Sequence, residues 1–135
     1  AGCTPAIYKC SISEGRQGMK QPMGAGVNDE QLDDMTAYVL SLSGRADAAS
    51  IGRIEEGKKQ YRILCVGCHG GQGEGSSAAG FPRLSDDVWL YGGSPGAIKE
   101  SIKQGRSGNM PAHAEFLDQE KIHLLAAYIY SLSNE

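Results

Sequence analysis

Cys65-Val66-Gly67-Cys68-His69 is a motif of two cysteines separated by two residues and followed at once by a histidine. This pattern attaches a c-type haem, whose vinyl groups form thioether bonds with the two thiols. The helical turn between the cysteines sets their separation, and the adjacent imidazole meets the iron from the proximal side. The motif therefore predicts one covalent haem c on Cys65 and Cys68, with His69 as an iron ligand.

A CxxC pair also occurs in redox disulfides and in zinc sites. A thioredoxin-like pair is expected in a βαβ context, whereas this one ends a helix-like segment and precedes a glycine-rich loop. A structural zinc site needs four ligands, usually including a second pair, and the sequence holds no second CxxC. We therefore favour haem attachment over both.

The second axial ligand is expected after the motif, in the segment 105–111 (GRSGNMP). Methionine with histidine is the ligand pair that raises the potential of cytochromes c. A single methionine is more often a core residue, but the loop context and the adjacent proline favour Met110 as the distal ligand. The remaining methionines precede the motif: Met19, Met23 and Met35. His113 remains a competing ligand, and His123 is expected on a helix surface or in helix packing.

The composition fits one compact domain plus an extension, since the chain has 135 residues and a mass of 14.3 kDa. Its net charge of −3 argues against nucleic-acid binding. No apolar run approaches the roughly 20 residues that span a bilayer, and no signal peptide is evident. We expect a mature or excised piece in the periplasm, because c-type haem is attached on the outer face of bacterial membranes.

The chain contains an internal repeat at a shift of 90 residues. Residues 15–18 (GRQG) fall on 105–108 (GRSG), and residues 37–43 (AYVLSLS) fall on 127–133 (AYIYSLS). Residues 1–44 are therefore expected to be the C-terminal half of a first copy without its haem motif, followed by a complete domain over residues 45–135.

The first copy is not expected to hold a haem by itself. Lys20 stands where the second copy has Met110, with Met19 and Met23 beside it. Cys3 and Cys10 do not match haem cysteines, and they form a local disulfide or stay free.

Local signals predict several helices and two connections. One helix is expected from an Asn28/Gln31 capping box to Leu42, and another over residues 51–66. A third is expected from Ser94-Pro95 to about Gln104, and a fourth after the capping residue Asp118. Ile98 and Ile102 share one face. The last helix carries an apolar stripe that predicts core packing: Ile122, Leu125, Ala126, Ile129 and Leu132. Residues 70–80, with five glycines, predict a loop, and residues 44–50 predict a linker.

These motifs resemble class I cytochrome c, an all-α fold wrapped around a covalent haem. The segments 84–93 (LSDDVWLYGG), 102–106 (IKQGR) and 123–133 are more narrowly similar to the diheme subunit III of cbb3-type cytochrome c oxidase. The resemblance covers residues 51–135 as the second haem domain and 5–43 as the tail of the first. The family's first haem motif and membrane anchor are absent from the sequence.

The resemblance implies further site residues and a role. The carbonyl of Pro82 is implied as the acceptor for the proximal imidazole, and Trp89 and Arg106 are implied near the haem propionates. The implied function is a relay of electrons from a donor cytochrome c to the catalytic oxidase subunit, in a parent anchored to the inner membrane. With both axial positions filled, the chain is expected to be no enzyme.

Two alternatives remain open. The first is a free-standing soluble cytochrome c shuttle of the same fold. The second is a haem enzyme or gas sensor, which requires a labile or absent Met110 ligand.

Overall fold

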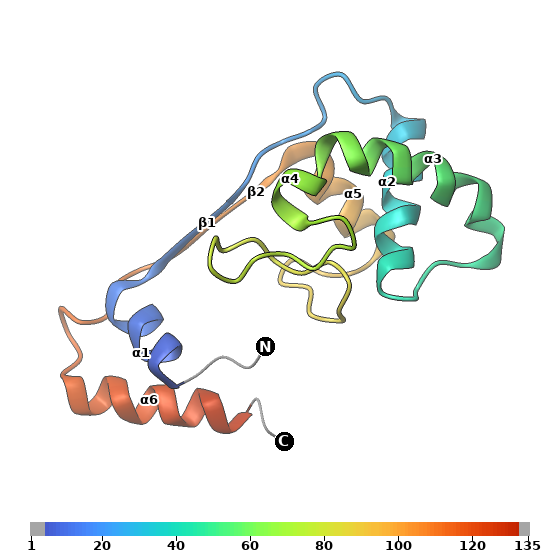
Figure 1. The fold of residues 1–135 in the computed structure, drawn as a ribbon. Coiled ribbons are helices and arrows are strands. Elements are labelled where there is room, and N and C mark those ends of the chain that lie inside the picture. Colours follow the sequence, from blue (N-terminus) through green and yellow to red (C-terminus); the bar gives the residue numbers. More distant parts are fainter. Residues whose placement is uncertain (1–4, 133–135) are drawn as a thin grey trace. The chain divides into compact units, whose positions relative to one another are not determined.

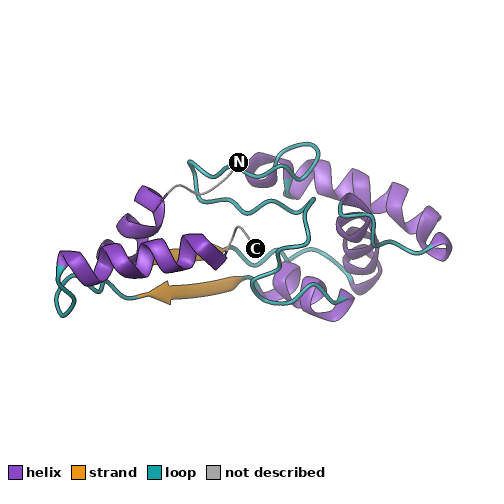
Figure 2. Cartoon of the chain, turned by 90° about the horizontal axis from the view of Figure 1, so that it is seen from below, coloured by secondary structure: helices purple, strands orange, loops and turns teal. Residues whose placement is uncertain are grey.

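The computed structural model describes residues 5–132 (Figure 1). Most regular structure is helical, with one small two-stranded sheet formed by β1 and β2 (Figure 2). The helices are α1 (Pro5–Glu14), α2 (Asp29–Leu42), a 3-10 helix η1 (Ala48–Ser50), α3 (Ile51–Leu64), α4 (Val66–His69), α5 (Pro95–Gln104) and α6 (Gln119–Leu132). The strands are β1 (Arg16–Lys20) and β2 (Arg106–Met110). The helical architecture agrees with the class I cytochrome c fold.

The internal repeat is visible in the elements themselves. The bounds of α1, β1 and α2 lie 90 residues before those of α5, β2 and α6. Each copy thus contributes a helix, a short strand and a longer helix in the same order.

The helices begin at the expected capping residues. At the start of α2, the Asn28 side chain accepts from the Gln31 amide at 2.9 Å, and the Gln31 side chain accepts from the Asn28 amide at 3.0 Å. Ser94 caps α5 ahead of Pro95, and Asp118 accepts from the Lys121 amide before α6. These caps satisfy amides that have no partner within the first helical turn.

Three local expectations were wrong in detail. Residues 106–110 form a strand and not a loop, because β1 supplies a pairing partner. The linker contains η1. The helix expected over 51–66 ends at Leu64, and α4 begins at Val66 as a separate turn. The proposed partner of Cys10, Cys3, lies outside the described residues.

The structure divides into two compact units. The motif unit, Lys20–Arg106, contains α2, α3, α4 and α5. The terminal unit, formed by residues up to Met19 and from Ser107 onward, contains α1 and α6. Each unit therefore combines elements of both repeat copies.

The core of the motif unit lies where α2 packs on α3 and α5. The side chains of Tyr38 and Tyr61 meet edge to face, with ring centroids 5.0 Å apart. Gly57 lets the two helices approach closely, because a β-carbon there would clash with the Asp34 carbonyl. Seven buried side chains form this core: Leu32, Met35, Tyr38, Val39, Tyr61, Ile98 and Ile102.

The terminal unit has a smaller core between α1 and α6 (Figure 1). Ile12, Ile122 and Ala126 are buried there, and Ile129 packs against them. The expectation that the whole α6 stripe is buried was wrong for Leu125 and Leu132, which are 41% and 54% exposed. Within this unit the main helix contact of α6 is with α1, which covers only part of the stripe.

Candidate functional site

The haem motif occupies the end of α3 and the single turn of α4. The His69 amide donates to the Cys65 carbonyl at 2.9 Å, and the Cys68 amide donates to the same oxygen at 3.2 Å. Cys65 is half-buried, Cys68 is exposed, and neither forms a disulfide. The turn thus holds two free thiols beside one imidazole, as thioether attachment requires.

His69 is oriented by a backbone acceptor from another loop. Its Nδ1 lies 3.0 Å from the carbonyl oxygen of Pro82, the contact that the resemblance implies. Burial lowers the pKa of His69, and the Pro82 hydrogen bond opposes this shift. With the proton on Nδ1 donated to Pro82, the neutral ring keeps its Nε2 lone pair for a metal.

Sequence reasoning missed the residues that fix the loop after the motif. The hydroxyl of the fully buried Tyr61 donates to the Gly70 carbonyl at 2.8 Å, and the Gly75 amide donates to the His69 carbonyl at 2.8 Å. Glu74 accepts from the Gln72 amide at 2.8 Å. In the sequence, Tyr61 is distinguished only by its position one helical turn after Gly57.

Trp89 carries a buried polar atom that has no partner among the described residues. Its indole Nε1 is buried without a hydrogen bond, although the residue as a whole is half-buried. Arg45 lies over the indole, 4.8 Å from the ring centroid, and donates to the Gly93 carbonyl at 2.8 Å. Arg45 was not predicted, since nothing in the linker sequence distinguishes it from a solvated cation.

Arg106 is anchored to α5. Its Nε donates to the Ser101 hydroxyl at 2.9 Å, and its Nη1 lies 3.3 Å from a Glu100 carboxylate oxygen. The guanidinium also lies 5.0 Å from the centroid of the Tyr91 ring. These contacts fix the side chain within the motif unit.

Lys20 is another residue that the sequence did not assign to the site. Its half-buried side chain lies within electrostatic reach of Cys65, Cys68 and His69. Burial lowers the pKa of its amine, while the two cysteines raise it. Burial likewise raises the pKa of the Cys65 thiol, and Lys20 lowers it.

Met110 belongs to the other compact unit. It ends β2 in the terminal unit and is 37% exposed. His113 follows in the same unit. Its ring is half-buried, and the ring centroids of His113 and Phe116 lie 5.2 Å apart. The other expected site residues all belong to the motif unit: Cys65, Cys68, His69, Pro82, Trp89 and Arg106.

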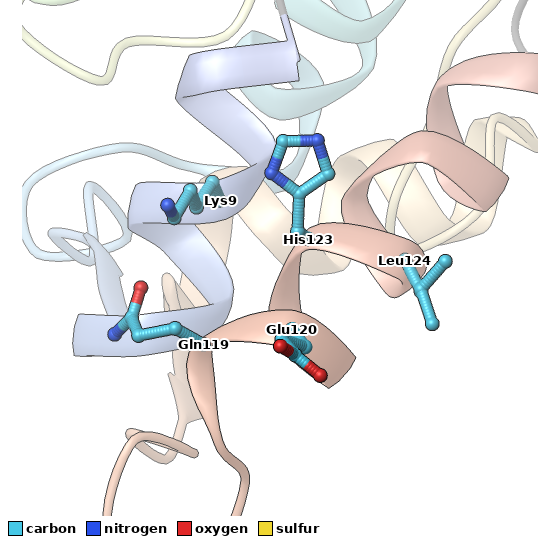
Figure 3. A pocket seen from close by; sticks show the side chains of 5 residues that line it. All are labelled: Lys9, Gln119, Glu120, His123 and Leu124. Atoms are coloured by element: carbon cyan, nitrogen blue, oxygen red, sulfur yellow. The ribbon is translucent and has the colours of Figure 1, made fainter.

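A surface depression of the terminal unit lies between α1 and α6 and holds no residue of the haem motif. Figure 3 shows its lining, with Lys9 from α1 and with Gln119, Glu120, His123 and Leu124 from α6. His123 is exposed on the helix surface, as expected. Across residues 5–132, no helix combines the length and apolar character that crossing a membrane requires.

The residues of the motif unit fit a covalently attached haem. The free thiols and the oriented, neutral imidazole are the donor set of such a group. The unpaired Trp89 Nε1 is a donor suited to a carboxylate, as a haem propionate offers.

The family to which known proteins relate this chain is consistent with a haem held by these residues. Residues 52–129 match the family described as cytochrome C oxidase, cbb3-type, subunit III. The chain belongs to this family. Membership of this cytochrome c family implies a covalently bound haem c.

Individual relatives of the chain are also subunits of cbb3-type cytochrome c oxidase. The chain is 41% identical over 108 residues to the cbb3-type cytochrome c oxidase subunit CcoP of Azospirillum sp. (strain B510), covering 76% of this chain and 36% of that protein. It is 38% identical over 133 residues to CcoP of Rubrivivax gelatinosus, covering 98% of this chain and 43% of that protein. The chain thus spans about two fifths of the length of these subunit III relatives.

Proposed function

We propose that this chain is the haem-bearing electron-transfer part of a cbb3-type oxidase subunit III, and that it holds a single haem c. The observation that carries the proposal is the fixed His69 imidazole beside two free thiols, in a chain of this family. The relay runs from a donor cytochrome c to the catalytic oxidase subunit. The site is periplasmic, in a parent subunit associated with the inner membrane.

Several residues of the chain would hold the haem, each with a separate role. Cys65 and Cys68 would tether it, and His69 would bind the iron through Nε2 while the Pro82 carbonyl fixes the ring. Met110 would supply the second side-chain ligand of the iron, and Trp89 and Arg106 would contact the propionates. When bound, the haem supplies one-electron exchange between ferric and ferrous iron. The protein itself would catalyse no reaction, because His69 and Met110 together would leave no position on the iron for a substrate.

The haem count tests the proposal directly. Mass spectrometry of the denatured protein is expected to show one added haem that acid acetone does not extract. Replacing both motif cysteines (Cys65→Ser with Cys68→Ser) should abolish this covalent mass, because no thioether can form. Cys10→Ser is the matched control, since Cys10 is an exposed thiol on α1. Finding two haems or no haem in the unsubstituted protein would contradict the proposal. A loss of haem in the Cys10→Ser control would contradict it as well.

A further inference from the structure

The backbone of Arg45 is fixed by the way in which α2 ends. The Gly44 amide donates to the Ser41 carbonyl at 3.1 Å, and the Arg45 amide donates to the Leu40 carbonyl at 2.9 Å. Gly44 has a φ of 69°, in the left-handed region, so the two bonds form a Schellman motif. This cap turns the chain out of α2 and sets the point from which the Arg45 side chain extends.

Within residues 5–132, the contacts of the Arg45 guanidinium are with neutral groups. Its Nε donates to the Ser43 hydroxyl at 3.0 Å, and its Nη1 donates to the Gly93 carbonyl at 2.8 Å. Its Cζ lies 4.8 Å from the centroid of the Trp89 ring. A planar cation held by two directed hydrogen bonds lies against the indole in one orientation. The contact therefore restricts how the Trp89 side chain can turn.

Gly93 leaves just enough room for this pair of side chains. A β-carbon at Gly93 would lie 2.7 Å from Nη1 of Arg45 and 2.9 Å from Cγ and Cδ1 of Trp89. Gly93 is not one of the glycines with a positive φ, so glycine is required here for steric reasons. The Gly92 amide donates to the Trp89 carbonyl at 3.1 Å and closes the turn between them. The indole is thus held between this turn and the end of α2.

The arrangement leaves one polar atom of Trp89 unused. Its Nε1 is buried and has no hydrogen-bond partner among the described residues. Native proteins rarely leave a buried donor unsatisfied, so this atom indicates an acceptor that the described polypeptide does not supply. A haem propionate is such an acceptor, and the Arg45 cation on the same ring would favour a negative charge there.

We propose that Arg45 is a positioning residue for the haem: it holds the Trp89 indole so that Nε1 would donate to a propionate, and this hydrogen bond raises the reduction potential. The physical reason is charge. A propionate that accepts a hydrogen bond stabilises the more positive ferric iron less, and the ferrous form is favoured. This inference rests on the haem proposed at Cys65, Cys68 and His69.

The first measurement follows the indole proton of the reduced, haem-loaded protein by nuclear magnetic resonance. Trp89 is the only tryptophan in the sequence, so a single indole N–H signal reports on it. Arg45→Gln should speed the exchange of this proton with solvent by about two- to fivefold, the change in equilibrium that corresponds to an exposed cation–π contact. Arg53→Gln removes the same charge from α3, where Arg53 pairs with Asp34 at 3.2 Å, and it should leave the exchange unchanged.

The second measurement is the reduction potential of the same haem-loaded proteins in a double-mutant cycle. Arg45→Gln and Trp89→Phe should each lower the potential. Arg45→Gln should lower it little further once Trp89 is replaced, because Arg45 acts through the indole. Gly93→Ala keeps both side chains but forces them apart, and it should lower the potential as well. Gly96→Ala is its control, because a β-carbon at Gly96 meets nothing within 4 Å.

The outcomes separate this inference from the proposed function. Unchanged indole exchange in Arg45→Gln, or additive shifts of the potential in the double variant, would overturn the inference and leave the covalent haem in place. Faster exchange without a lower potential would overturn it too, since Arg45 would then hold an indole that does not act on the haem. The absence of covalent haem from the unsubstituted protein would overturn the proposed function and this inference with it.

Discussion

Tyr61 links the core of the motif unit to the loop that follows His69. Its ring is fully buried against Tyr38, and its hydroxyl donates to the Gly70 carbonyl. Burial raises the pKa of this phenol above its ordinary value, with the charges of nearby acidic groups acting in the same direction. A buried hydroxyl of this kind both orders a loop and creates a pH-dependent contribution to stability.

We expect Tyr61→Phe to lower the free energy of unfolding by about 1–3 kcal/mol, because it leaves the Gly70 carbonyl without its donor. The raised pKa favours the native state below the phenol's unfolded pKa of about 10. Stability is therefore lost as pH rises above that value, where the unfolded chain releases the proton first. Denaturant unfolding at neutral and alkaline pH measures both effects.

Tyr128→Phe is the control for this prediction, since Tyr128 is 62% exposed. A control that loses as much stability as Tyr61→Phe would contradict the role of the Gly70 hydrogen bond. If the free energy of unfolding falls equally at alkaline pH in Tyr61→Phe and in the unsubstituted protein, the titration does not belong to Tyr61.

At the scale of elements, charge explains why α5 pairs with α2 in this structure. Lys99 lies 2.7 Å from an Asp33 oxygen, and Lys103 lies 3.3 Å from an Asp29 oxygen. At the equivalent positions α6 has His123 and Gln119, neither of which is a carboxylate. Each of these partly exposed pairs contributes only about 0.2–1 kcal/mol, so they bias the pairing without making it exclusive.

Chain connectivity acts in the same direction. Helix α2 reaches α3 through a short connection, residues 43–50, whereas α6 is separated from α3 by residues 65–118.

The capping box of α2 provides a prediction at this scale. Asn28→Ala should lower the free energy of unfolding by about 1 kcal/mol, because it removes the side-chain acceptor of the Gln31 amide. Guanidinium unfolding monitored by circular dichroism measures the loss. Ser50→Ala is the comparison, since the Ser50 side chain makes no capping bond at the start of α3. An equal loss of unfolding free energy in Asn28→Ala and Ser50→Ala would show that the capping box adds no stability of its own.

The longer helices, their caps and the haem motif could be predicted from the sequence because these signals are local, whereas the strands depend on a pairing partner elsewhere in the chain. Asn28, Ser94 and Asp118 act within one helical turn, and the CxxCH turn carries its own geometry. The pairing of α2 with α3 could not be predicted, because α2 and α6 have nearly the same apolar pattern and differ in long-range charge and connection length. For the same reason Lys20 was read only as a mismatch to Met110, although the Lys20 amine lowers the pKa of the Cys65 thiol.

At the scale of the whole chain, the charge is nearly balanced. The net charge is −3, and residues 45–135 carry ten basic and eleven acidic side chains. Beside Trp89, the apolar side chains of Val88 and Leu90 are 78% and 87% exposed. Such a surface favours docking by apolar contact and local charge over long-range steering.

Electron transfer from a small donor cytochrome c, measured by stopped flow, should therefore be fast and only moderately weakened by salt. We expect the second-order rate constant to fall by less than about tenfold between low and physiological ionic strength, at the weak end of electrostatic steering. Leu90→Asp should slow the reaction at both ionic strengths, because it removes apolar contact area. Phe116→Asp, at a 67% exposed position of the terminal unit, is the control. A steep salt dependence would contradict apolar docking, and turnover of oxygen or peroxide by the purified protein would contradict its role as a relay.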